Sequence, residues 1–279
     1  MEKDIVTIYN KVEKNLRFLT SSGLRNKIIL SLSDGMKDLE DIKTETGSDS
    51  STIIHAIRDM EQEKLIIEIK EGYHLTPVGK ILSLKLVDLV KTLHTLENHQ
   101  DFWMNHDING IPDEFLERIH ELKEYDIVSS SPKNIWRSFS MYLELVRKAK
   151  EFRGVSPIFH PDFVTIVEKL AKKKIDIHII ITNDILDSIL KALDTRQRNE
   201  LHKTLTADNL GLWITDLNPR VAFTVTNSIL SLALFSTEGT FDTSHNLISR
   251  HNQSLKWGRE LFDYYLKGSR RVIPQQIAP

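Results

Sequence analysis

The chain has 279 residues and a formal net charge of −2, with 40% hydrophobic and 27% charged residues, which is enough for two globular domains that each bury a core. It contains no cysteine, so disulfide bonds, thiolate zinc sites and cysteine nucleophiles are excluded. Residues 1–100 hold 14 Lys+Arg against 16 Asp+Glu, and this absence of a basic segment excludes strong non-specific binding to nucleic acid.

The first predicted element is a helix over residues 4–20. Its apolar residues fall on one stripe at helical spacing and have no obvious partner nearby in the sequence; they are Ile5, Ile8, Val12, Leu16 and Leu19. The sequence MEKDIVTIYN lacks the charged and then apolar layout of a signal peptide. We therefore expect a cytoplasmic protein whose first helix packs on another subunit.

Residues 24–79 are predicted to form a winged helix-turn-helix. An apolar helix, a short second helix, a Ser/Thr-led third helix and a hairpin follow one another in the order that this DNA-binding module needs. The expected ranges are 25–35, 36–47, 49–66 and 65–76. Gly47 stands at the turn before the third helix, where we expect a positive φ.

The third helix is the predicted DNA-reading element. Ile53, Ala56, Ile57 and Met60 share its buried face. The residues expected to contact DNA from the opposite face are Ser50, Ser51, Thr52, Ile54, His55 and Arg58. Short hydroxyl side chains at a helix start can cap the helix and reach phosphates or base edges. Ile54 has two interpretations, contact with a thymine methyl group or extra core packing.

The hairpin is interpreted as the wing. Ile67 and Ile69 alternate with polar residues, which is typical of a half-buried strand, and Glu71-Gly72 forms the turn. Lys70, Tyr73 and His74 are expected to touch the DNA backbone; the alternative is a solvated hairpin tip.

A longer amphipathic helix is predicted over residues 78–98. Its leucine stripe favours either a dimer seam or a core helix, and it is too short and irregular for a sustained coiled coil. If the stripe is a dimer seam, leucines 82, 86, 89 and 93 would be exposed in a monomer, and we expect the seam to be built from residues 4–20 and 78–98.

The pattern changes after residue 98. We expect an α+β protein overall: a mainly α winged helix-turn-helix domain at 1–98, a linker with a connecting helix at 99–124, and an α/β layered effector domain at 125–279. Strands are expected at 126–129, 152–158, 175–182, 210–215, 221–226 and 229–235, and helices at 134–150, 162–172, 183–193, 195–205 and 255–267. The last strands follow one another directly, which predicts an antiparallel portion. The nearly apolar run at 221–235 is too short and too interrupted to span a membrane, so no membrane partner is expected.

Residues 24–80 resemble an ArsR/MarR-type winged helix. The whole chain resembles a family of regulators from methanogenic archaea in which such a domain precedes a Fil-type, methanogenesis-regulatory effector domain. The later segments that carry the resemblance are FWMNHDINGIPDEFLERI (102–119), FRGVSPIFHPDFV (152–164) and WGRELFDYYLKGSRRV (257–272). The resemblance implies sequence-specific control of transcription by a dimer, and it implies no particular ligand.

No catalytic constellation is found. There is no GxSxG elbow, no phosphate-binding loop and no HExxH pair. The second domain also resembles the phospholipase-D-like sensor domains of some archaeal regulators, but no His is followed two residues later by Lys, as the HxKxxxxD motif of that fold requires. We therefore expect no enzyme activity, and binding rather than turnover in the second domain.

Several polar and aromatic residues are candidates for a ligand site. Ser156, His160 and Thr182 stand near predicted strand ends and Trp213 could wall a pocket, with capping, loop packing and core packing as the alternatives. His178 is expected to be a hydrogen-bonded core residue. His245 and His251 are weak evidence for a metal site, so no metal and no cofactor are expected.

The sequence thus predicts a homodimeric, sequence-specific regulator of transcription that binds double-stranded DNA. Its second domain would sense a small molecule or a protein effector whose identity the sequence leaves open; the alternative for that domain is a solid body used for dimerisation or docking. The alternative for the whole protein is an interaction module whose winged helix contacts the transcription machinery instead of DNA, which the slightly acidic charge favours.

Overall fold

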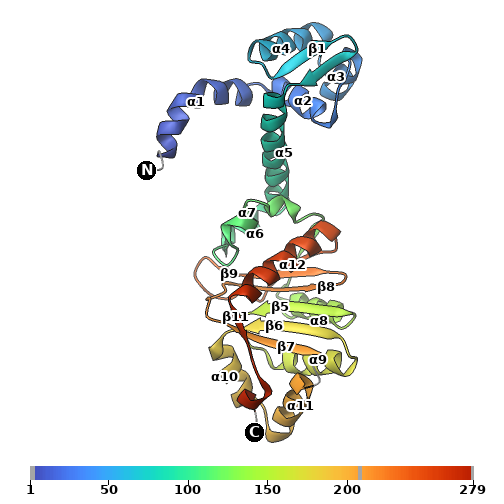
Figure 1. The fold of residues 1–279 in the computed structure, drawn as a ribbon. Coiled ribbons are helices and arrows are strands. Elements are labelled where there is room, and N and C mark those ends of the chain that lie inside the picture. Colours follow the sequence, from blue (N-terminus) through green and yellow to red (C-terminus); the bar gives the residue numbers. More distant parts are fainter. Residues whose placement is uncertain (1–3, 207–208, 278–279) are drawn as a thin grey trace. The chain divides into compact units, whose positions relative to one another are not determined.

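The computed structural model describes residues 4–206 and 209–277. The chain, drawn as a ribbon in Figure 1, divides into two compact units, residues 1–93 and residues 94–279. Each unit has its own hydrophobic core. No helix within the described ranges has the length and apolarity needed to cross a membrane. The protein is of mixed α+β class, with a mainly helical N-terminal region before a sheet-containing region, as predicted.

The N-terminal unit carries the elements expected from the sequence, in the expected order. They are α1 (Ile5–Thr20), α2 (Gly23–Ser31), a 3-10 turn (Leu32–Asp34), α3 (Leu39–Thr46), α4 (Ser50–Gln62), β1 (Ile66–Ile69), β2 (Gly72–Leu75) and the first part of α5 (Pro77–Glu97).

The core of this unit is made by the predicted apolar faces of three helices. Its buried residues include Ile28, Ile29, Leu32, Ile42, Ile53, Ile57 and Met60, and Ala56 packs against them half-buried. The three- and four-residue spacing of these side chains turns them to one side of each helix, which is why the sequence pattern located them.

Local signals also set the helix ends. Asp38 and Asp41 form a reciprocal capping box at the start of α3. Gly47 ends α3 with φ 70° and ψ 20°, which confirms the expected positive φ. The turn between α3 and α4 is therefore determined by residues within it.

The hairpin β1–β2 is tied to the helices. Its strands pair antiparallel, with Glu68 opposite Tyr73, and the backbone of Tyr73 exchanges hydrogen bonds with that of Lys37 in both directions. Gly72 lies beside this contact with φ 146°, and a Cβ on it would stand 2.5 Å from the Lys37 carbonyl oxygen. A side chain at position 72 would therefore push the hairpin away from the helices.

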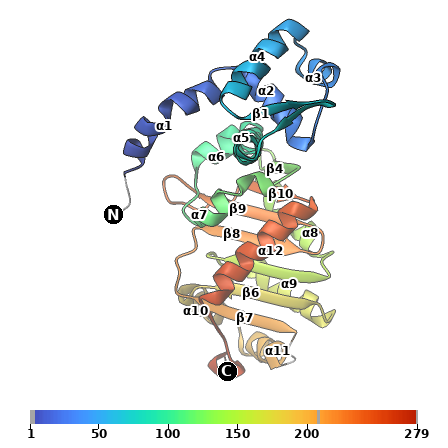
Figure 2. The same ribbon diagram turned by 45° about the horizontal axis from the view of Figure 1, so that its top comes forward.

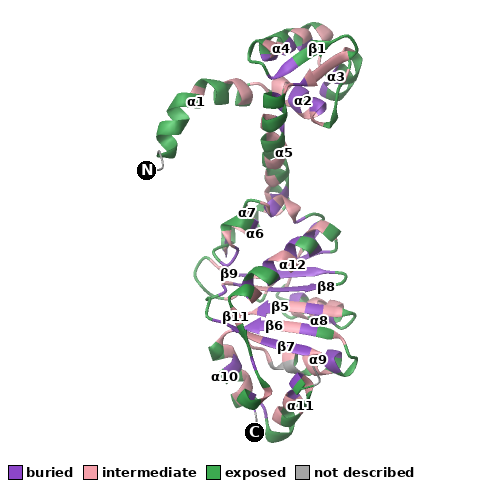
Figure 3. Cartoon of the chain, in the orientation of Figure 1, coloured by how far each residue is buried: buried purple, intermediate pink, exposed green. Residues whose placement is uncertain are grey.

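The two amphipathic helices of this unit leave much apolar surface uncovered (Figure 3). Helix α1 has no buried residue. On α5 the prediction of four exposed leucines is wrong for two: Leu82 and Leu86 pack against the N-terminal core, whereas Leu89 and Leu93 are about half exposed. The reason is that α5 begins against this core, so its first turns already have a partner.

The C-terminal unit is built on one twisted sheet. Its strands are β3 (His106–Asp107), β4 (Tyr125–Ser129), β5 (Glu151–Ser156), β6 (Asp176–Ile181), β7 (Leu210–Thr215), β8 (Val221–Thr226), β9 (Leu230–Ser236), β10 (His245–Ser249) and β11 (Ser269–Arg271). The order across the sheet is β11-β7-β6-β5-β8-β9-β10-β4, with β3 added beside β9. Strands β5, β6 and β7 are parallel, and the pairs on either side of them are antiparallel.

Helices cover both faces of this sheet. They are α6 (Gln100–Asn105), α7 (Asp113–Leu116), α8 (Arg137–Val146), α9 (Pro161–Lys172), α10 (Asn183–Ala192), α11 (Thr195–Thr206) and α12 (Asn252–Lys267), with 3-10 turns at Ile119–Glu121 and Pro274–Ile277. Helix α12 crosses one face, as Figures 1 and 2 show, and α8 and α9 lie on the other (Figure 2).

The segment at 99–124, which we expected to act as a linker, contributes to the core under α12. Phe102, Phe115, Ile119 and Leu122 are buried there, and Phe115 packs edge-on against the fully buried Trp257. These large apolar residues are separated by polar ones over a break-rich stretch. The local pattern therefore resembled a linker between domains, although its apolar side chains pack into the core.

Candidate nucleic-acid interface and cavity

The start of α4 is organised by an acidic cap. Asp49 is the N-cap residue; its carboxylate accepts hydrogen bonds from the backbone N–H and hydroxyl of Thr52, at 2.9 and 2.7 Å, and from the hydroxyl of Ser51, at 2.6 Å. These bonds, with that of Ser51 largest, hold the pKa of Asp49 well below its usual range. The cap is thus a carboxylate and not, as the sequence suggested, one of the hydroxyl residues.

The predicted DNA-contacting residues of α4 are divided by exposure. Ser51, Thr52, His55 and Arg58 are exposed on one face of the helix. Ser50 and Ile54 are half-buried, and Ile54 lies outside the N-terminal core, so its role stays undecided.

The predicted wing residues have different environments. Lys70 is exposed at the hairpin turn. Tyr73 is half-buried, and burial first, then the negative charge of Glu68, raises the pKa of its phenol. His74 is half-buried with Nδ1 3.0 Å from the Leu75 carbonyl oxygen. The hairpin therefore exposes one cation, and its aromatic residues are held against the unit.

Two other cations near the helix-turn-helix are engaged. Lys37 is paired with Glu45, and the ammonium group of Lys80 donates to the Ser33 carbonyl oxygen at 2.6 Å. Within the described part of the chain, Arg58 and Lys70 have no ion-pair partner. They are the cations of the predicted site that remain available for phosphates or bases.

The C-terminal unit contains a cavity of ≈ 460 Å³ on the sheet face opposite α12. Small-molecule sites commonly have volumes of roughly 300–1,000 Å³. The walls come from β5, β6, β7, β8, α8 and α9, and they are mainly apolar. At one side, Phe139, His160 and Phe163 cluster, with ring centroids of Phe139 and His160 4.5 Å apart.

A pair of hydroxyls provides a polar group in this wall. The Tyr142 hydroxyl lies 3.0 Å from Oγ1 of Thr224, and burial raises the pKa of Tyr142 to about 12. One hydroxyl donates to the other, so the pair retains one O–H that can donate to a ligand.

Two of the four predicted ligand residues line the cavity. Ser156 and His160 do so, although Oγ of Ser156 donates to the Ile158 carbonyl oxygen and His160 caps α9 through Nδ1. Thr182 and Trp213 are not among the lining residues.

Trp213 lies on the α12 face of the sheet. Its indole N–H faces Nδ1 of His178 at 3.3 Å, and Nε2 of His178 contacts Asp176 at 3.1 Å. His178 is hydrogen-bonded as expected, but its side chain is 30% exposed, so the expected core position is wrong. Burial, followed by the charge of Arg153, lowers its pKa.

The residues that shape the cavity were not predicted from the sequence. Phe139 and Tyr142 stand three positions apart on α8, a spacing that places them on one helix face. Nothing in that spacing distinguishes a cavity wall from a filled core.

Family comparisons match both parts of the chain. Residues 13–94 match the N-terminal domain, and residues 135–268 the middle domain, of the methanogenesis regulatory protein FilR1. The FilR1 protein of Methanothrix harundinacea (strain 6Ac) is 30% identical over 260 residues, which are 93% of this chain and 58% of that protein. The chain thus spans little more than half the length of this relative.

Two solved structures give weaker likenesses. TrmBL2, an archaeal chromatin protein described as showing a novel mode of DNA binding, is 12% identical with a TM-score of 0.43, covering 94% of this chain and 99% of that one. The phospholipase D family member Nuc from Salmonella typhimurium is 13% identical with a TM-score of 0.40, covering 54% and 99%. Scores this low carry no argument about function.

Proposed function

Because the chain belongs to the FilR1 family of methanogenesis regulatory proteins, of which it carries the N-terminal and middle domains, we propose that it is a cytoplasmic regulator of transcription that binds double-stranded DNA. The observation that carries the proposal is the exposed face of α4, where Ser51, His55 and Arg58 stand side by side on a helix fixed by its own core. A rigid helix with an exposed polar face is what insertion into a major groove requires.

The chemistry of this face favours base edges over phosphates at its N-terminal end. Ser51 and Thr52 already donate their protons to Asp49, so their oxygens offer lone pairs. Such oxygens can accept from the amino groups of adenine or cytosine in the major groove. The negative charge of Asp49 opposes a phosphate at the same place. Phosphate contacts would then come from Lys70 on the hairpin and from Arg58, unless Arg58 reads a base.

The small number of free cations supports binding as a homodimer. Two copies double the phosphate contacts and bring two α4 helices to two half-sites. The apolar stripes of α1 and of α5 around Leu89 and Leu93 are the surfaces we propose for the seam. An isolated chain would leave these stripes in water.

The cavity supports a sensing role for the second domain. Its apolar and aromatic walls, with the Tyr142–Thr224 hydroxyl pair as donor, suit a small apolar or aromatic molecule that carries one acceptor group. Such a ligand would act by favouring one spacing of the paired α4 helices. A domain used only for docking a partner would not require a cavity.

Titration of the full chain against duplex DNA from its own promoter tests the DNA-binding role. A shuffled duplex of equal composition is the control. We expect tighter binding to the promoter and a plot of log K against log salt concentration with a slope of about −2 to −4, corresponding to a few phosphate contacts per dimer. Equal and salt-independent affinity for both duplexes would instead support the alternative, contact of α4 with a protein of the transcription machinery.

A further inference from the structure

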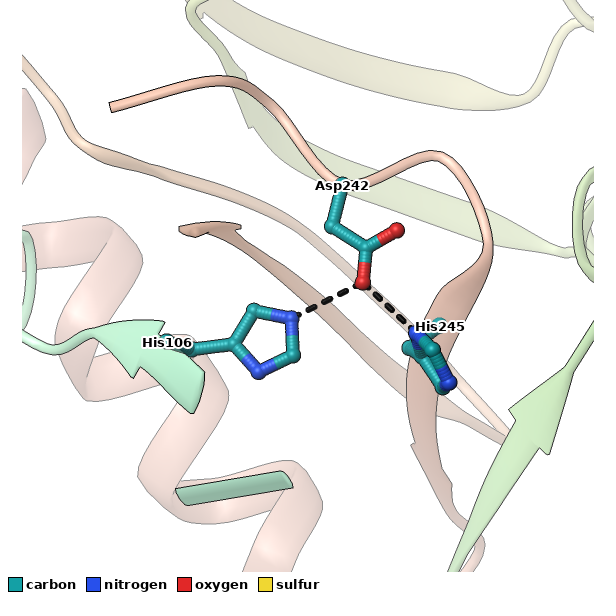
Figure 4. A group of neighbouring side chains, drawn as sticks. All are labelled: His106, Asp242 and His245. Atoms are coloured by element: carbon teal, nitrogen blue, oxygen red, sulfur yellow. Dashed lines mark hydrogen bonds and ion pairs between the residues drawn. The ribbon is translucent and has the colours of Figure 1, made fainter. Parts of the chain in front are cut away.

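Three side chains that are distant in the sequence converge at one edge of the C-terminal sheet (Figure 4). His106 opens β3 and lies opposite Ser236 of β9. Asp242 stands in the loop between β9 and β10, and its backbone N–H donates to the Leu234 carbonyl oxygen. His245 is the first residue of β10. Each residue is therefore placed by sheet pairing or by a loop anchored to the sheet.

The nitrogen atoms of the two imidazoles approach the same oxygen atom. Nε2 of His106 lies 2.9 Å, and Nδ1 of His245 2.6 Å, from Oδ2 of Asp242. All three atoms lie within 4.8 Å of one another. The side chains are 5%, 42% and 16% exposed for His106, His245 and Asp242, so the group is sheltered but open on the His245 side.

The remaining polar atoms of His106 and Asp242 have partners of their own. Nδ1 of His106 lies 2.6 Å from the Phe102 carbonyl oxygen. Oδ1 of Asp242 accepts from the backbone N–H and hydroxyl of Ser244, at 2.7 and 2.6 Å. Histidine ligands of metal sites are typically oriented in this way, by donation from the second ring nitrogen to a carbonyl or carboxylate.

The hydrogen-bond inventory of His106 points to a cation. A neutral imidazole carries one N–H, and the Phe102 oxygen can only accept it. Nε2 then presents a lone pair to a carboxylate oxygen, and these two atoms need either a second ring proton or a metal ion between them. His178 is different: its Nδ1 faces the indole N–H of Trp213 and its Nε2 faces Asp176, which a neutral ring satisfies completely.

We propose that His106, Asp242 and His245 bind a divalent transition-metal ion such as Zn²⁺, through Nε2, Oδ2 and Nδ1. Two imidazoles and one carboxylate with an open fourth position are a known ligand set for such ions. Ligands about 2.0–2.1 Å from a tetrahedral ion stand roughly 3.4 Å apart, so each histidine nitrogen needs to move away from Oδ2 of Asp242 by less than about 1 Å.

The proposed ion would join two segments of the C-terminal unit. It would hold the stretch from α6 to β3, which directly follows α5 in the chain, to the loop between β9 and β10. Asp242 and His245 also line the apolar cavity, so the site borders the proposed ligand space. The metal site rests on its own geometry and does not depend on the DNA-binding proposal.

Metal binding to the full chain tests the inference. The protein is first treated with a chelator. Binding of Co²⁺ is then measured by its visible absorption, and binding of Zn²⁺ is measured by competition with Co²⁺ and by thermal unfolding. We expect one ion to bind per chain. Bound Co²⁺ should show the visible absorption of a low-symmetry coordination geometry, and Zn²⁺ should raise the melting temperature.

Variants assign the ligands. His245→Ala removes a partly exposed ring and preserves the fold, as circular dichroism would show, while weakening Zn²⁺ binding by at least about 100-fold. Asp242→Asn and His106→Gln should likewise weaken Zn²⁺ binding while preserving the fold. His178→Gln is the matched control, since that ring also contacts an aspartate, and it should bind Zn²⁺ like the parent protein.

Two results would overturn the inference. One is the absence of Co²⁺ absorption together with no effect of Zn²⁺ on unfolding. The other is a folded His245→Ala protein that binds Zn²⁺ as tightly as the parent protein. In either case the three side chains form a hydrogen-bonded clamp and not a metal site.

Discussion

At the residue scale, α4 carries opposite charges at its start and further along its length. Asp49 caps the helix and keeps its negative charge, and Arg58 lies more than two turns further along with no carboxylate partner in the described chain. A carboxylate repels phosphate, whereas a guanidinium can bind phosphate or a guanine edge. The face is thus suited to a specific site more than to general attraction to DNA.

We expect Arg58→Ala to weaken binding to the promoter duplex by about 1–3 kcal/mol, with little change in stability, if Arg58 reads a base. Fluorescence anisotropy at fixed salt measures the effect. Lys85→Ala, an exposed cation on α5, is the control and should bind like the parent protein. Unchanged affinity of the Arg58 variant would remove this residue from the interface.

At the element scale, the joint between the hairpin and α5 is closely packed. A Cβ on Gly79 would stand 2.0 Å from the Leu65 carbonyl oxygen. The Thr76 hydroxyl donates to the Lys64 carbonyl oxygen at 2.6 Å and accepts from the backbone N–H of Gly79 at 3.0 Å. Helix α5 therefore starts in direct backbone contact with the residues that precede β1.

Gly79→Ala should destabilise the N-terminal unit by about 1–3 kcal/mol, because the added methyl group must displace backbone. Gly23→Ala is the control, since nothing lies within 4 Å of the Cβ it would add. All four tryptophans belong to the C-terminal unit. Circular dichroism should thus show an unfolding transition at lower temperature for Gly79→Ala, while the transition seen in tryptophan fluorescence keeps its temperature. Equal stability of the two variants would contradict the packing argument.

The cavity is an element-scale feature as well, because strands β8 and β9 supply part of its wall. Ala222 and Ala233 are paired across these strands and both line it. We expect apolar aromatic compounds to raise the melting temperature of the tryptophan transition, since they bind only the folded state. Ala233→Phe fills the space and should abolish the shift, and Ala192→Phe, on an exposed position of α10, should keep it. A shift retained in Ala233→Phe would place the ligand elsewhere.

At the scale of the whole molecule, the uncovered apolar stripes are the main feature that a single chain leaves unexplained. Side chains on α1 such as Ile5 and Val12 are 73% and 46% exposed, and Leu89 and Leu93 on α5 are 52% and 49% exposed. Exposed contiguous apolar surface on a soluble domain commonly marks an interface. A closed dimer would bury the same surface on both copies.

Replacing Leu89 and Leu93 together by Glu should yield a folded monomer that has lost promoter binding. Light scattering at micromolar concentration reports the mass, which should fall by half. Lys85→Glu combined with Lys91→Glu changes exposed charges on the same helix and should leave the dimer intact. A parent protein that is already monomeric at this concentration would refute the proposed seam.

The sequence by itself determined the local structure. The apolar faces of α2, α3 and α4, the αL turn at Gly47 and most strands of the C-terminal sheet follow from helical spacing, capping and β-branched runs, all of which depend on residues near each other in the chain. The short or polar strands β3, β10 and β11 were not predicted, because pairing with other strands holds them in place.

Only the tertiary structure decided the binding features. It placed Ser156 and His160 at a cavity and Trp213 on the other face, drew Phe102 and Phe115 into a core, and packed Leu86 against the N-terminal core while leaving Leu89 exposed. It also brought His106 to Asp242, 136 positions later. The physical reason is that periodicity gives the direction of a side chain relative to its own helix or strand, whereas cavities, shared faces and ligand clusters depend on which distant elements pack against it.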